Sequence, residues 1–97
     1  MESRSSRPRN VSFPFGQLVA TPGALQAIPI LEFFSAFQRH LIGDWGALDA
    51  EDWKANDRAL IDGTRLFSVY ESVSGIRFWI ITEADRSVTT VLLPSEY

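Results

Sequence analysis

The chain has 97 residues, 45% of them hydrophobic, with a formal net charge of −3 and a pI near 5.0. This length supports one domain with a single core, and the mild acidity argues against a nucleic-acid-binding surface, which usually carries a basic excess. Cysteine is absent, which excludes disulfides, thiolate metal sites and a cysteine nucleophile. No apolar run approaches the roughly 20 residues that span a bilayer, so we expect a cytoplasmic protein.

The N-terminal region divides into a polar tail and an extended segment. Residues 1–10 are rich in serine and arginine and offer no apolar anchor, which predicts a disordered tail before a single domain at 11–97. Residues 11–20 contain Pro14, which predicts an extended segment and favours an edge strand because proline cannot donate to an inner ladder. Thr21 and Pro22 then begin a short helix as its N-cap and first residue, and Pro29 interrupts it.

Two further helices follow. The spacing from residue 30 to 42 is helical, with a Gly43 stop. We expect one apolar stripe to face the core, formed by Ile30, Phe34, Phe37 and Leu41 and widened by Leu31 and Phe33. The next helix should run over 50–61 between an Asp49 N-cap and Gly63. Its thin apolar face, with Trp53, Leu60 and Ile61, predicts packing at the edge of the core.

Three strands complete the chain, at 65–70, 76–82 and 88–93. Their connections are too short for parallel crossovers, so they predict an antiparallel meander. The central strand directs Ile76, Phe78 and Ile80 to one face and Arg77, Trp79 and Ile81 to the other. The order predicts an α+β fold in which two to three helices pack on one face of a small antiparallel sheet.

From Phe13 onward the chain also resembles a family of small, uncharacterised bacterial proteins that occur on plasmids and other mobile elements. The stretches that carry the resemblance are ATPGAL at 20–25, RHLIGDWGALDAEDWKANDRAL at 39–60, RLFSVY at 65–70 and WIITEADRSVTTVLLPSEY at 79–97. Some members are labelled as restriction-modification proteins. The chain contains neither the glycine-rich cofactor loop nor the catalytic tetrapeptide of a DNA methyltransferase, so the resemblance implies little biochemistry.

The densest polar cluster invites two interpretations. It consists of His40, Asp44, Asp49, Glu51, Asp52 and Asp57, with Trp45 and Trp53 among them. One hypothesis is an oxygen-rich metal site or a His40–Asp44 acid/base pair. The spacing matches neither an EF-hand loop nor HExxH, and one histidine allows no histidine-based zinc triad. We favour structural roles: His40 complements a helix dipole and donates to Asp44, while the other carboxylates serve the next helix.

A second cluster lies in the last hairpin turn, where we expect Asp85 to bond nearby backbone and to form a local ion pair with Arg86. The alternative is that Arg86 binds a carboxylate or a phosphate.

The aromatic residues are the third candidate. We expect Phe33, Phe34, Phe37, Phe67 and Phe78 in the core, whereas Trp45, Trp53 and Trp79 fit either the core or an interface.

The sequence thus favours a non-enzymatic binding or regulatory module that acts through protein contacts, with no cofactor and no metal. The candidate binding residues are His40, Asp44, Trp45, Trp79, Asp85 and Arg86. The alternative is a small metal-dependent hydrolase that uses His40 and Asp44. Because the helices cover only one sheet face, we expect the face of Trp79 and Ile81 to form a homodimer, unless the segment 13–19 covers it. We expect neither a membrane nor nucleic acid as partner.

Overall fold

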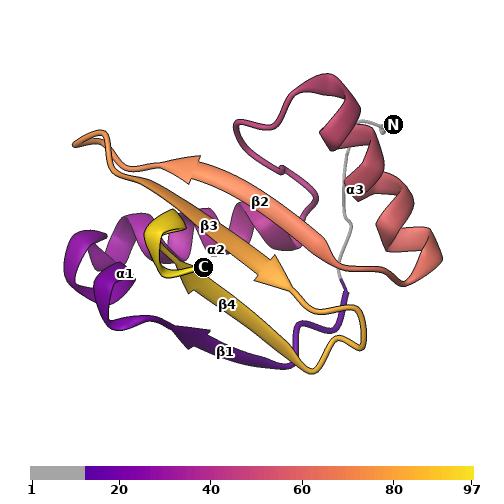
Figure 1. Ribbon diagram of the computed structural model, residues 1–97, viewed down its shortest axis with the longest axis horizontal. Helices are drawn as coiled ribbons and strands as arrows, with labels where there is room; N and C mark the ends of the chain where they lie inside the picture. Colours follow the sequence, from indigo (N-terminus) through magenta and orange to yellow (C-terminus); the bar gives the residue numbers. More distant parts are fainter. Residues whose placement is uncertain (1–12) are drawn as a thin grey trace, which may run out of the picture.

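The computed structural model describes residues 13–97, so the predicted tail lies outside the described residues. The α+β class is confirmed (Figure 1). The elements in chain order are β1 (Gln17–Ala20), α1 (Pro22–Ala27), α2 (Ile30–Leu41), α3 (Ala50–Asp62), β2 (Leu66–Glu71), β3 (Arg77–Thr82), β4 (Val88–Leu92) and the 3-10 turn η1 (Pro94–Glu96).

The four strands form one sheet in the order β1-β4-β3-β2. The meander of β2, β3 and β4 is antiparallel as predicted, with Phe67 opposite Ile81 and Trp79 opposite Leu92. β1 occupies an edge, but it runs parallel to β4, so the sheet is mixed rather than purely antiparallel. Short loops dictate the direction of neighbouring strands only. The pairing of β1 is instead fixed by contacts remote in sequence, such as Gln17 opposite Val88.

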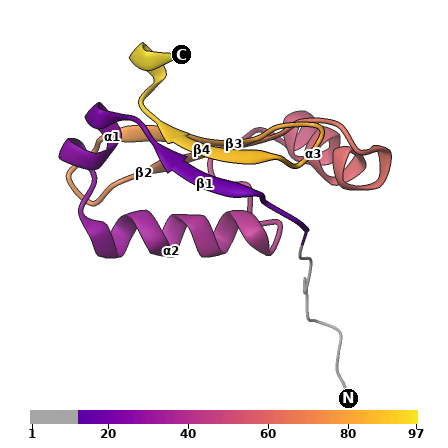
Figure 2. The ribbon, with the colours of Figure 1, turned by 90° about the horizontal axis from the view of Figure 1, so that it is seen from below.

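α2 lies across one face of the sheet and η1 stands on the opposite face, while α3 packs beside β2 (Figure 2). The register sorts the side chains between the faces. The inner face, toward α2, carries Leu66, Ser68, Tyr70, Phe78, Ile80, Thr82, Thr89 and Val91. The outer face carries Phe67, Val69, Trp79, Ile81, Thr90 and Leu92.

The predicted helix ends are confirmed by their hydrogen bonds. The Thr21 hydroxyl accepts from the backbone N–H of Ala24 at 3.2 Å, and the Asp49 carboxylate accepts from that of Asp52 at 2.8 Å. α3 extends one residue beyond its predicted end and stops at Gly63, whose φ of 75° suits glycine. These ends are set by local chemistry, which is why sequence alone located them.

The predicted apolar stripe of α2 is correct for Phe33, Phe37 and Leu41 and wrong for Ile30, Leu31 and Phe34. Its buried residues are Phe33, Ala36, Phe37 and His40. Leu31 is 82% exposed and Phe34 is 46% exposed, although both were expected to face the core. The apolar stripe read from the sequence is displaced from the buried face, because the helix is rotated toward the side of Ala36 and His40. In this orientation His40 faces the sheet, where its ring nitrogens form hydrogen bonds with the hydroxyl groups of Ser68 and Thr82.

The outer face is less exposed than the predicted homodimer requires. Ile81 is only 3% exposed, and Trp79 packs edge-on between the rings of Phe67 and Tyr97, at centroid distances of 5.0 and 5.6 Å. Phe67 therefore lies half-buried on this face rather than in the core under α2. The N-terminal segment is not the cover, because Phe15 packs on Phe37 of α2, on the inner side.

Candidate functional site

His40 sits at the centre of a buried hydrogen-bonded chain. Its Nδ1 lies 2.6 Å from the Ser68 hydroxyl and its Nε2 lies 2.9 Å from the Thr82 hydroxyl. Thr82 in turn lies 2.7 Å from the Thr89 hydroxyl, which donates to the carbonyl of Phe15. Each hydroxyl has a single hydrogen, and that of Thr89 is used in the bond to Phe15, so Thr82 must donate to Thr89. The Thr82 oxygen therefore accepts from the Nε2–H of His40. Nδ1 of a neutral ring then accepts from Ser68.

Burial lowers the pKa of His40 to about 3, and the nearby Arg86 charge acts in the same direction. The ring is therefore neutral at physiological pH, which corrects the prediction that a charged His40 complements the helix dipole. Its N–H donates to Thr82 and not to Asp44. Because both ring nitrogens are occupied and the side chain is buried, neither is directed at an external substrate.

Asp44 instead serves the surface beside α2. Its carboxylate accepts two hydrogen bonds from the Arg39 guanidinium, at 2.8 and 3.2 Å, and a third from the backbone N–H of Gly46. The guanidinium also stacks 4.9 Å above the Tyr70 ring, whose hydroxyl donates to the carbonyl of Asp44. The Asp44 hydrogen bond raises the pKa of Arg39, and burial raises the pKa of Tyr70. This arrangement joins the end of α2 to β2.

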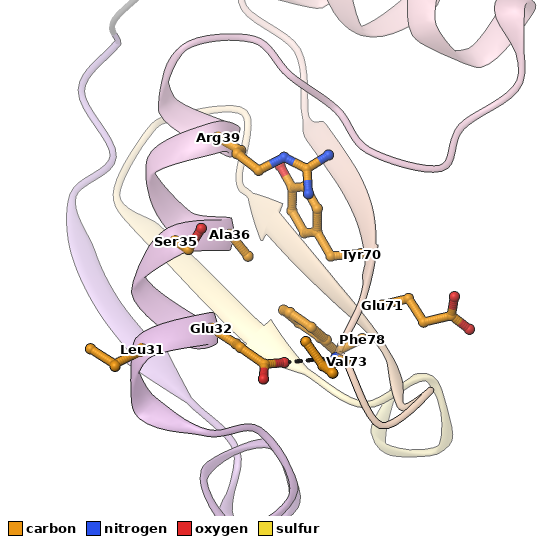
Figure 3. A pocket seen from close by; sticks show the side chains of 9 residues that line it. All are labelled: Leu31, Glu32, Ser35, Ala36, Arg39, Tyr70, Glu71, Val73 and Phe78. Carbon is orange, nitrogen blue, oxygen red and sulfur yellow. Dashed lines mark hydrogen bonds between the residues drawn. The ribbon is translucent and has the colours of Figure 1, made fainter.

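A shallow groove adjoins this cluster, between α2 and the β2–β3 hairpin (Figure 3). We call it the α2–β2 groove; its volume is about 220 Å³ and it is lined by Leu31, Glu32, Ser35, Ala36, Arg39, Tyr70, Glu71, Val73 and Phe78. The Glu32 carboxylate spans it and accepts from the backbone N–H of Val73 at 2.9 Å. Val73 is 92% exposed on the hairpin side, and Leu31 points to solvent from the helix side.

The hairpin-turn residues have structural roles. The Asp85 carboxylate accepts from the backbone N–H and the hydroxyl of Ser87, which lowers its pKa, and it forms no ion pair with Arg86. Arg86 has a φ of 61° and donates to the carbonyls of Thr64 at 2.7 Å and Ala59 at 3.3 Å. These carbonyls lie at and just beyond the end of α3, where a cation complements the helix dipole. The predicted local ion pair is therefore wrong.

Trp45 belongs to the interior. It is fully buried, packs against Ala59 and Leu66, and donates from its indole N–H to the Asp57 carboxylate at 2.9 Å. The His40 ring lies 5.5 Å from it. A tryptophan that was compatible with either core or interface from sequence is thus a core residue.

The structure brings three of the six predicted site residues together and separates the rest. The His40 ring contacts both Trp45 and Phe13 edge-on, and Arg86 lies 5.9 Å above the Phe13 ring. Asp44, Trp79 and Asp85 lie apart from this group, on the surfaces described above. Among residues 13–97, no group of three or more histidine, aspartate or glutamate side chains is placed to hold a metal ion.

Sequence reasoning missed two residues of the outer face. Arg65 and Tyr97 join Phe67, Trp79 and Ile81 around a hollow of about 260 Å³, with the Arg65 guanidinium 5.3 Å above the Tyr97 ring. Tyr97 reaches this position because Glu96 binds the start of α1, through the Thr21 hydroxyl and the Gly23 N–H. The residues after the last predicted strand are mostly polar, and nothing in their sequence predicts the bonds of Glu96 to the start of α1.

Comparisons with protein-family models, curated proteins and solved structures found no match. Within residues 13–97 no helix is long and apolar enough to cross a membrane. The function is therefore inferred from which polar groups are engaged in the fold and which side chains remain exposed.

Proposed function

We propose that the chain is a non-enzymatic binding module that contacts a partner protein through α2 and the α2–β2 groove. The observation that carries the proposal is the concentration of exposed apolar side chains on this side. Leu31 and Ile42 project from α2, and Val73 projects across the groove. Exposed apolar side chains that border a groove are typical of interaction sites.

The charged groups of the same region support recognition rather than catalysis. Arg39 is held by Asp44 and Tyr70, and Glu32 is held by the Val73 N–H. Such fixed charges at the border of an apolar surface orient a partner at little entropic cost. The alternative hydrolase would require a histidine with a free nitrogen, and His40 has none. The cysteine-free composition fits a module that acts in the cytoplasm.

Site-specific photo-crosslinking in cells tests this proposal. A photoreactive residue replaces Val73, and a matched one replaces Ile61, an aliphatic residue of similar exposure on α3. We expect an adduct with a different protein from position 73, none from position 61, and loss of the adduct when Leu31→Asp is added. The proposal is wrong if both positions give the same products, or if Leu31→Asp leaves the adduct unchanged. Adducts between two copies of this chain are scored separately by mass.

A further inference from the structure

The two edges of the sheet differ in whether their outward backbone groups are hydrogen-bonded. At the β2 edge, these groups bond to other parts of the chain. The Asn56 side chain, from α3, donates to the carbonyl of Phe67 at 2.5 Å and accepts from its N–H at 3.2 Å. Two residues along, the Val69 N–H donates to Trp45 and its carbonyl accepts from Ala47. Gly46 permits this approach, because a Cβ there would collide with the Val69 carbonyl. A strand edge covered in this way cannot pair with another chain.

The β1 edge has no such cover within the described part of the chain. The N–H groups of Gln17 and Thr21 point toward β4 and donate to the carbonyls of Ser87, just before that strand, and of Val91 within it. Since N–H groups alternate in direction along a strand, those of Leu18 and Ala20 point away from the sheet. Figure 1 shows β1 as the lower rim of the sheet, with no element of residues 13–97 beyond it.

The β1 edge lacks charged protection against strand pairing, although the strand is only four residues long and Pro14 and Pro22 flank it. Proteins commonly guard an open edge with lysine, proline or an inward-pointing charge. β1 is Gln-Leu-Val-Ala, and no charged residue occurs between Arg9 and Glu32. An uncharged strand can meet its own copy without bringing like charges together.

An apolar surface lies next to the β1 edge, on the α2 side of the sheet. Phe15, Leu18 and Leu41 pack against the core cluster there, and Phe15 contacts Phe37. The helical positions of Ile30 and Phe34 lie on the same side of α2 as Leu41, away from the groove that borders β2. Phe34 is 46% exposed and Ile30 is 60% exposed. A strand that pairs with β1 would extend the sheet and cover this apolar surface.

We infer that the occupant is a second copy of this chain, whose β1 pairs antiparallel with the first about a two-fold axis at Val19. This register places Leu18 opposite the partner's Ala20, and the outward N–H and C=O groups of both residues are then satisfied reciprocally. Val19 meets the partner's Val19 on the outer face as a close pair. A two-fold contact of one surface with itself closes at two copies. The resulting dimer has a continuous eight-stranded sheet and leaves the α2–β2 grooves at its far sides.

Charge substitution at the two-fold position tests the inference with the full-length chain. Wild type should sediment at twice its 10.9 kDa mass. Val19→Lys and Val19→Glu should each sediment as monomers, because like charges would meet about 5 Å apart. An equimolar mixture should recover the dimer. Thr90→Lys, on the same face but on β4, should remain dimeric, since the two lysines would be about 14 Å apart across three strand spacings.

A disulfide test covers the case in which the charged variants fold poorly. The chain contains no cysteine, so Val19→Cys introduces a single thiol that should form an intermolecular disulfide on mild oxidation, whereas Thr90→Cys should not. A monomeric wild type at 100 µM, or a dimer broken by Thr90→Lys but not by Val19→Lys, would overturn the inference. The latter result would assign the dimer to the Trp79 face. Neither result bears on the crosslinks at Val73.

Discussion

The two faces of the sheet are protected by different means. On the inner face, α2 covers aromatic side chains and a chain of hydrogen-bonded hydroxyls that passes through a neutral histidine. On the outer face, Trp79 is shielded by Phe67 and by the exposed Tyr97. The inner face gains stability from fully paired buried polar groups, each of which is costly to leave alone. On the outer face, the contact between Trp79 and Tyr97 is open to water, so removal of the Tyr97 ring should cost much less than removal of a buried ring.

The largest expected effect is on the inner face. His40→Ala removes a buried ring and leaves the Ser68 and Thr82 hydroxyls without their partner. We expect the free energy of unfolding to fall by about 4 kcal/mol at pH 7, measured by urea denaturation. Gln38→Ala, an exposed change on the same helix, should alter it by less than about 0.5 kcal/mol. A loss below 1 kcal/mol for His40→Ala would show that the hydroxyls find other partners.

Acid should weaken the inner face selectively. The pKa of His40 is about 3 in the folded protein and 6.5 as an ordinary value, so between these pH values only the unfolded chain binds the proton. Stability is therefore complete above pH 6.5 and falls as the pH decreases. From pH 7 to pH 4 the loss should be about 3 kcal/mol. His40→Gln should flatten the profile between pH 4.5 and 6.5, whereas an unchanged slope would assign the effect to carboxylates.

At the border between the faces, Asn56→Ala uncovers the edge of β2. The N–H and C=O of Phe67 lose the Asn56 side chain as hydrogen-bond partner, although water can reach part of the site. We expect a loss of about 2 kcal/mol in thermal or urea unfolding. Lys54→Ala, on the exposed side of α3, serves as control. Hydrogen exchange should show faster exchange at the Phe67 amide, and equal protection in both variants would contradict the proposed closure.

The smallest effect is expected on the outer face. Tyr97→Ala removes the ring that packs on Trp79 but creates no buried cavity. We expect a loss of no more than about 1 kcal/mol, together with greater acrylamide quenching of tryptophan fluorescence. Tyr97→Phe, which keeps the ring, should leave both measurements unchanged. A loss comparable to that of His40→Ala would abolish the difference between the two faces.

Sequence by itself determined the features that depend on neighbouring residues. Thr21 and Asp49 locate helix starts because their side chains bond backbone groups three residues away, and Gly63 ends α3 because it adopts a positive φ. The antiparallel meander follows from connections too short for any other path. The α+β class and the edge position expected for the first extended segment rest on the same local rules.

The tertiary structure alone decided what each polar or aromatic candidate does. His40 and Arg39 are adjacent in sequence, yet one is buried and neutral while the other is an exposed cation bonded to Asp44. The partners of His40 lie 28 and 42 residues away, and those of Arg86 lie up to 27 residues away. The apolar stripe of α2 marks the helix as amphipathic, but it does not place the polar His40 on the buried side. Contacts between distant segments select it, since only one rotation satisfies the buried hydroxyls of the sheet.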